Sequence, residues 1–294
     1  MDADFLFPSD RVSVMGVVNT TPDSFSDGGR FFESGSGELD IGRAVEAAED
    51  LVRHGADSID IGGESTRPGA LEVAPRIQIE RVVPVVAELA QRVDVPISVD
   101  TRSAQVADAA LRAGASVVND VSGLGHDHAL AECVARADAA LILGHMRGTP
   151  LTMRSQSSYR DLREEIATEL MEAVERALKA GVVRERLVID PGIGFSKDAE
   201  QSFALLGGAG WFGERFGLPV LVGPSRKSFL GSVVDAVASA RDEATYAACA
   251  VAAFAGADAV RVHDVRGARQ AVAVGRAARE ATQRLDADGQ AAER

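Results

Sequence analysis

The stretch Leu187-Val188-Ile189-Asp190-Pro191-Gly192-Ile193-Gly194-Phe195 places a carboxylate directly after a short apolar run, and proline and glycine then end the strand. The same arrangement, an apolar run that ends in polar residues, recurs at Ile59-Asp60, Val99-Asp100, Val118-Asn119-Asp120 and Val260-Arg261-Val262-His263. In a parallel barrel the carboxyl ends of all strands meet at one rim. The recurrence therefore predicts a ring of functional groups at one mouth of such a barrel.

We expect eight strands near residues 12–18, 57–61, 96–100, 116–119, 139–143, 186–190, 219–223 and 259–262, with helical patterns between them such as 40–54, 76–92, 103–113, 159–180 and 264–281. Most of these strands are continuously apolar, as is typical of a parallel sheet covered by helices. A Gly-Ala pair precedes three strands, at Gly55, Gly114 and Gly256, where glycine can supply the left-handed residue that ends a helix. The pattern predicts an α/β fold, a single (β/α)8 TIM barrel. An open doubly wound sheet is the alternative, but no GxGxxG follows the first strand.

The chain has 294 residues, of which 26% are charged and 46% hydrophobic, and its net charge is −13. This length suits one α/β barrel, which we assign to residues 1–285, with a disordered tail at 286–294. The negative charge argues against nucleic acid as a partner, so any phosphate must be held by a few local cations.

Cys133 and Cys249 lie far apart in apolar helical contexts, which suits core packing in a reducing compartment. The N-terminus lacks a basic segment followed by an apolar core, and no apolar run approaches about 18 residues. We therefore expect a cytoplasmic protein that does not bind a membrane.

Two long loops follow the first two expected strands. The first covers residues 19–29 (NTTPDSFSDGG), and the second covers residues 62–70 (GGESTRPGA). Long loops at the carboxyl ends of barrel strands often close over substrates. We interpret both loops as parts of the site, although simple connectors remain an alternative.

Three polar residues at separate strand ends suggest the chemistry of the ligand. Asp100 and Asp190 are acceptors, and the Asn119 amide both donates and accepts. A pterin fits, because its 2-amino-pyrimidinone edge offers adjacent N–H groups that a carboxylate can accept together. Each residue alone could equally be a strand-end cap or an ion-pair partner.

Candidate anion ligands follow the last two strands. The segment 223–228 (GPSRKS) places Lys227 and two hydroxyl groups where we expect a helix to begin, and backbone N–H groups there favour anions. Arg261 and His263 are two residues apart, so they point to the same face of an extended chain. We interpret His145, which ends the fifth strand, as structural.

Together these segments resemble the dihydropteroate synthase family, a pterin-binding family, over most of the chain from about Val12 to Arg279. The segments that carry the resemblance are residues 15–29, 60–69, 98–101, 119–123, 190–195, 225–227 and 261–265. The resemblance implies a transferase of folate biosynthesis. In this reaction p-aminobenzoate attacks the methylene carbon of 6-hydroxymethyl-7,8-dihydropterin diphosphate, which yields 7,8-dihydropteroate and diphosphate.

The resemblance also implies roles for matching residues. The pterin would be bound by Asp100, Asn119, Asp190, Phe195, Gly223, Lys227 and Arg261. The p-aminobenzoate would be bound by Phe25, Thr66, Arg67, Pro68 and Ser228. The diphosphate would be bound by Asn19, Thr66, Arg261 and His263, with Asn19 as the protein ligand of Mg²⁺. The catalytic residues would be Asp100, Lys227 and Arg261, and the family implies a homodimer that sulfonamides target.

Two positions depart from the family pattern. Gly144 stands where methionine usually precedes the histidine of the fifth strand, and Ala244 replaces a glycine before Thr245. Neither change removes a polar group.

Two other functions remain as alternatives. A methyltetrahydrofolate-dependent methyltransferase would share the pterin acceptors but would not need the diphosphate ligands at 225–227 or the loop at 66–69. An inactive pterin-binding paralogue would be expected to have degraded loops, whereas both loops are intact here.

Overall fold

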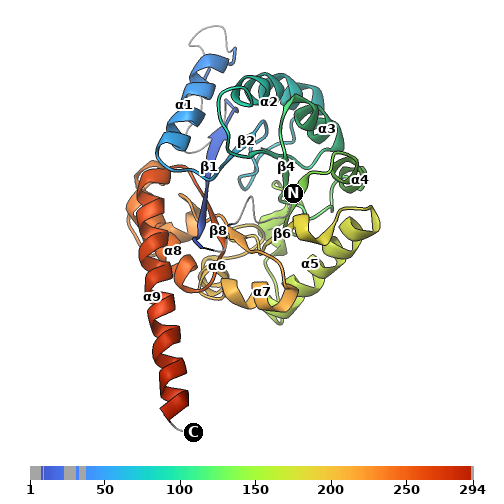
Figure 1. Cartoon of the computed structure of the whole chain (residues 1–294). Helices are drawn as coiled ribbons and strands as arrows, with labels where there is room; N and C mark the ends of the chain where they lie inside the picture. Colours follow the sequence, from blue (N-terminus) through green and yellow to red (C-terminus); the bar gives the residue numbers. More distant parts are fainter. Residues whose placement is uncertain (1–7, 9, 23–30, 33–37, 293–294) are drawn as a thin grey trace.

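Eight parallel strands form the centre of the molecule in the computed structural model, which describes residues 8, 10–22, 31–32 and 38–292 (Figure 1). The strands are β1 Ser13–Asn19, β2 Ser58–Gly62, β3 Ile97–Asp100, β4 Val117–Asp120, β5 Ala140–Gly144, β6 Leu187–Asp190, β7 Leu221–Val222 and β8 Ala259–Val262. Each expected strand is present, and β7 is shorter than expected.

Helices surround the strands (Figure 1). They are α1 Ile41–Arg53, α2 Pro75–Leu89, α3 Ala104–Ala113, α4 Ala129–Arg136, α5 Leu162–Lys179, α6 Ala199–Leu206, α7 Ala209–Phe216, α8 Asp242–Phe254 and α9 Val265–Ala292, with short 3₁₀ helices η2 Met153–Gln156, η3 Arg184–Arg186, η4 Ser228–Ser232 and η5 Ala238–Ala240. Aspartate side chains cap the first turns of α1, α5 and α6, which satisfies backbone N–H groups there. Within the described part of the chain, no helix has both the length and the apolar character needed to cross a membrane.

The described part of the chain ends in helix α9, which includes part of the segment 286–294 that we assigned to the tail. Helix α9 continues through residues 286–292 and projects beyond the barrel (Figure 1). Residues 286–292 combine three alanines and one glutamine, which favour helix, with two aspartates and one glycine, which do not, so helix propensity alone does not explain these last turns.

The sheet is a closed barrel and not the open alternative. Its strand order is β6-β5-β4-β3-β2-β1-β8-β7, with parallel pairing throughout. The two outer strands meet through a parallel bridge between Ile189 and Val220, and Ile189 N donates to the Pro219 carbonyl at 3.0 Å. The predicted (β/α)8 TIM barrel is confirmed.

Apolar residues fill the barrel, and a larger apolar layer separates the strands from the helices. The interior cluster contains Met15, Val117, Ala140, Ile142, Val188, Leu221 and Ala259. Because both faces of every strand are covered, the strands need no alternation of polar and apolar residues.

The Gly-Ala repeats lie at the amino-terminal end of the barrel, directly before β2, β4 and β8. Gly55, Gly114 and Gly256 have positive φ angles of 96°, 120° and 93°, as predicted. In two of the repeats an aspartate follows and accepts from the neighbouring strand: Asp57 Oδ2 from Val14 N and Asp258 Oδ2 from Val220 N, each at 2.8 Å. These carboxylates satisfy backbone donors where the ladder begins.

Asp57 also binds Arg11 and Arg269, so we expect its removal to destabilise the barrel. Asp57→Ala leaves the Val14 N–H without its acceptor and should lower the free energy of unfolding by about 1–3 kcal/mol. Asp57→Asn keeps an oxygen acceptor and should cost less. Thermal denaturation of both variants checks this order, and equal melting temperatures for the two would contradict it.

Candidate active site

A cavity of about 280 Å³ opens at the carboxyl ends of the strands. Its lining includes the following residues named from the sequence: Asn19, Thr66, Arg67, Pro68, Asp100, Asn119, Asp190, Phe195, Gly223, Lys227, Ser228, Arg261 and His263. The structure therefore brings these polar groups together around one cavity. Phe25 lies outside the described residues.

Arg261 joins two carboxylates at the base of the cavity. Its Nε donates to Asp60 Oδ2 at 2.6 Å, and its Nη2 donates to Asp100 Oδ2 at 2.8 Å. Asn119 Nδ2 donates to the same Asp60 oxygen at 3.0 Å. Asp60 is completely buried, so this carboxylate orients both Arg261 and Asn119 from below.

Asp60 is the main residue that we did not select from the sequence as a site residue. It ends an apolar run in the same way as Asp100 and Asp190, so the signal was present. Its partners could not be predicted, because they come from strands far apart in the sequence. Arg154 and Arg241 also line the cavity, and no local motif marks either of them.

The base of the cavity offers an unused acceptor. Asp100 Oδ1, on the cavity lining, is buried and has no hydrogen-bond partner within the described part of the chain, and the same holds for Asp60 Oδ1, which lies outside the lining. Burial raises the pKa of Asp100 to about 7, against the lowering effect of Arg261. A buried acceptor without a donor is costly, so the site suits a ligand that brings N–H groups to it.

A second acidic group, Asp190, faces the cavity from the carboxyl end of β6. Asp190 Oδ1 accepts from Gly192 N at 2.7 Å, and burial raises the pKa of this carboxyl against the opposing effect of Lys227. Lys227 Nζ donates to the Ile193 carbonyl and lies 4.3 Å from the centre of the Phe195 ring. Burial lowers the pKa of Lys227 to about 8.

His263 and Asn19 form the third part of the lining. Asn19 Nδ2 lies 3.5 Å from His263 Nε2, and Ser225 Oγ lies 2.8 Å from His263 Nδ1. Burial, together with Arg226 and Arg261, lowers the pKa of His263 to about 3, so the imidazole is neutral at pH 7. Arg226 itself turns toward α8, where it binds Asp242.

The loop after β2 is anchored at its base and near its tip. The Glu64 carboxylate accepts from Val73 N at 2.7 Å and from buried Arg102 at 2.9 Å. Near the tip, Gly69 N donates to the Pro150 carbonyl at 2.8 Å. These contacts hold residues 66–68 over the cavity.

The structure explains why glycine, and not the methionine usual in the family, stands at position 144. A Cβ atom on Gly144 would lie 2.7 Å from Val121 Cα, so no side chain fits there. The backbone at Val121, which lines the cavity, occupies this space instead.

Sequence comparisons agree with this geometry. The family model of the pterin binding enzymes matches residues 15–263. Dihydropteroate synthase of Synechocystis sp. is 45% identical over 261 residues, which are 88% of each chain. The Escherichia coli dihydropteroate synthase is 41% identical over 261 residues, which are 89% of each chain.

The solved structures to which the chain is similar are also dihydropteroate synthases. Dihydropteroate synthase of Yersinia pestis, in complex with a sulfonamide drug, has a TM-score of 0.86 and 39% identity over 92% of this chain and 95% of that chain. The Xanthomonas albilineans enzyme with 4-aminobenzoic acid has a TM-score of 0.82 and 37% identity over 92% and 93%. By sequence and by fold, the chain belongs to the dihydropteroate synthase family of pterin-binding enzymes.

Proposed function

We propose that the chain condenses 6-hydroxymethyl-7,8-dihydropterin diphosphate with p-aminobenzoate and releases 7,8-dihydropteroate and diphosphate. The observation that carries the proposal is the pair of buried carboxylates, Asp100 and Asp190, on the same cavity as the cations Arg261 and Lys227. Chromatographic detection of dihydropteroate, after incubation of the purified protein with both substrates and Mg²⁺, tests it. Pterin binding without product would instead indicate the inactive paralogue.

The pterin ring would occupy the base of the cavity. Asp100, Asn119 and Asp190 would bind its N–H groups and ring nitrogens, and the unused Asp100 oxygen supports this role. Phe195 and Gly223 would complete the walls. Arg261 would lie against the face of the ring while Asp60 holds its guanidinium.

Departure of diphosphate leaves positive charge on the pterin methylene group, which the ring can delocalise. The carboxylates Asp100 and Asp190 would stabilise this charge, and Arg261 and Lys227 would keep the net charge of the buried site balanced. The amine of p-aminobenzoate then forms the new C–N bond and loses a proton. The protein supplies no covalent nucleophile in this scheme.

The diphosphate would lie at the side of the cavity formed by Asn19, Thr66, Arg261 and His263. The described residues hold no cluster of three or more His, Cys, Asp or Glu that could bind a metal without other ligands. Mg²⁺ commonly takes few protein oxygens and completes its shell with substrate phosphates and water. The Asn19 amide oxygen therefore fits a substrate-linked Mg²⁺, which would neutralise charge on the leaving diphosphate.

The p-aminobenzoate would bind at the rim, where residues 66–68 and the exposed Ser228 line the cavity. Phe25, from the loop after β1, would contribute from outside the described residues. This pocket is separate from the rigid strand ends that bind the pterin. Closure of the loops would exclude water from the reactive cation.

We also propose a cytoplasmic homodimer. Apolar side chains of α8 and α9 are exposed, among them Val251, Phe254 and Val274, and a second copy would cover them. Both cysteines are buried and free, which suits a reducing compartment.

The first prediction concerns the pterin anchor. Asp190→Asn presents a donor where the ligand also presents one, so pterin diphosphate should bind at least about tenfold more weakly. The control, Arg67→Ala, should raise the KM for p-aminobenzoate and leave the pterin affinity within a few fold. Calorimetry measures both, and unchanged pterin affinity in Asp190→Asn would refute the assignment.

The second prediction concerns the metal. Chelation with EDTA should abolish formation of dihydropteroate, and Mg²⁺ should restore it, because the leaving diphosphate needs charge neutralisation. Asn19→Ala should require a higher Mg²⁺ concentration for half-maximal rate. Full activity in excess chelator would exclude the proposed role of Mg²⁺.

The third prediction concerns pH. The kcat/KM for pterin diphosphate should fall below about pH 7 as Asp100 takes up a proton, and above about pH 8 as Lys227 loses one. Lys227→Arg stays charged, so its high-pH limb should move upward while the low-pH limb remains. A high-pH limb at the same position in this variant would show that another group titrates there.

A further inference from the structure

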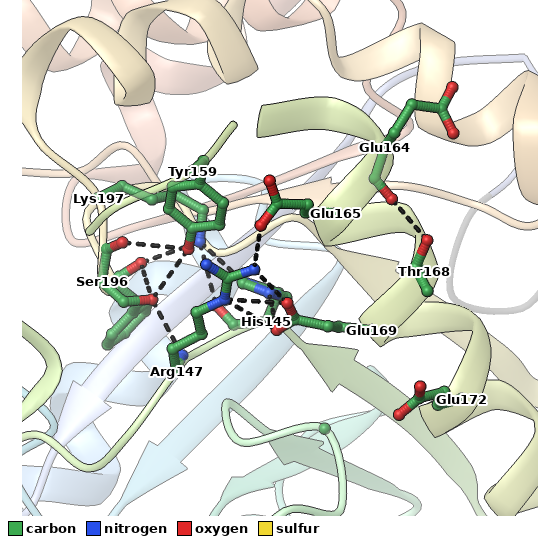
Figure 2. A network of polar contacts seen from close by, with 12 residues as sticks. His145, Arg147, Tyr159, Glu164, Glu165, Thr168, Glu169, Glu172, Ser196 and Lys197 are labelled. Carbon is green, nitrogen blue, oxygen red and sulfur yellow. Dashed lines mark hydrogen bonds and ion pairs between the residues drawn. The ribbon is translucent and has the colours of Figure 1, made fainter. Parts of the chain in front are cut away.

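A partly buried polar network joins the loops that follow β5 and β6 to helix α5 (Figure 2). Its members are His145, Arg147, Glu169, Ser196 and Lys197, which we call the Lys197 network. None of these five side chains lines the cavity, so direct contact with substrate does not explain the network.

The Lys197 ammonium links the two loops. Its Nζ lies 2.9 Å from the Phe195 carbonyl, 3.4 Å from the His145 carbonyl and 2.9 Å from His145 Nδ1. The Lys197 ammonium group therefore has an acceptor for each of its three N–H donors. Burial lowers the pKa of Lys197 well below its ordinary value, and Asp190 opposes this shift.

The other ring nitrogen of His145 continues the network. Because Lys197 donates to Nδ1, the proton of the neutral imidazole is on Nε2, which lies 2.9 Å from Glu169 Oε2. Burial and the Lys197 charge lower the pKa of His145 to about 4, which keeps the ring neutral. Arg147 pairs with Glu169 and Glu165, so the network ends on α5 (Figure 2).

The loop after β6 depends on this support. Gly192, Gly194 and Ser196 have φ angles of +72°, +79° and +46°. A Cβ atom on Gly192 would lie 1.9 Å from the His145 carbonyl oxygen and 3.3 Å from Lys197 Nζ, so the two loops are in close contact. Ser196 Oγ accepts from Arg147 N at 2.9 Å and donates to the Phe195 carbonyl at 2.8 Å, which holds a backbone conformation that serine rarely adopts.

Three groups of the proposed pterin site depend on this loop. The loop carries the Ile193 carbonyl, which accepts from Lys227, and the Phe195 ring, and its Gly192 N donates to the Asp190 carboxylate at the end of β6. We propose that Lys197 is a positioning residue for pterin binding, which acts by fixing the backbone of residues 192–195. The inference depends on the proposed pterin site.

The test compares Lys197→Met with Lys197→Gln in the full-length protein. The methionine variant has no N–H donors and should bind pterin diphosphate about tenfold or more weakly by calorimetry. The glutamine variant keeps two donors and should be intermediate. The KM for p-aminobenzoate, measured at saturating pterin diphosphate, should change by less than about threefold.

Arg186→Met is the matched control. Arg186 is a buried cation at the opposite end of β6, where it pairs with Asp138 at 2.5 Å. This variant should lower the melting temperature and leave pterin affinity unchanged. If the Lys197 variants behave in the same way, Lys197 is only a stabilising residue and the inference is wrong.

A double-mutant cycle shows whether Lys197 acts through the loop. In a Phe195→Ala background, Lys197→Met should weaken pterin binding by a smaller factor than in the wild type, because neighbouring residues that act together are not additive. Equal factors in both backgrounds would overturn the inference.

The same calorimetric titrations should include the wild-type protein and the Asp190→Asn variant as controls. If the wild type does not bind pterin diphosphate, the proposed function fails. If it binds, Asp190→Asn does not, and the Lys197 variants match the wild type, only the inference about Lys197 fails.

Discussion

The site depends on the need to balance charge where water is excluded. Asp60, Asp100 and Asp190 are buried at one mouth of the barrel, and an unpaired buried carboxylate is strongly unfavourable. Arg261 binds the first two, and Lys227 lies close enough to Asp190 to stabilise its charge. Because Arg261 is on β8 and Lys227 follows β7, both are distant in sequence from the carboxylates that they stabilise, and the site exists only when the barrel has closed.

Much of this arrangement could be predicted, because a parallel barrel puts all carboxyl strand ends at one rim. A run such as Val99-Asp100 therefore specifies both the element and the position of the side chain. The positive φ angles at Gly55, Gly114 and Gly256 likewise follow from local helix ends. The sequence could therefore predict which strand-end residues lie near one another at the mouth of the barrel, although not Arg154 and Arg241, which no local motif marks.

The pairing among those residues could not be predicted. Sequence places Asp60 at a strand end, but its bonds to Asn119 and Arg261 depend on barrel closure. The contacts of Lys197 could not be predicted either. A lysine in a loop, two residues after Phe195, would be expected to point into solvent, whereas its ammonium group contacts atoms of His145 on another loop. The last turns of α9 could not be predicted either, because residues 286–292 include two aspartates and a glycine, which disfavour helix.

Closure of the barrel is weakest between β6 and β7. Strand β7 has two residues, and one bridge, between Ile189 of β6 and Val220 directly before β7, joins the two segments. Amide hydrogens along this seam should exchange with solvent more readily than those between β1 and β2, which pair over five residues. Since Asp190 ends β6 and Lys227 follows β7, a ligand held by both would span the seam, and the barrel would gain cooperativity as the site fills.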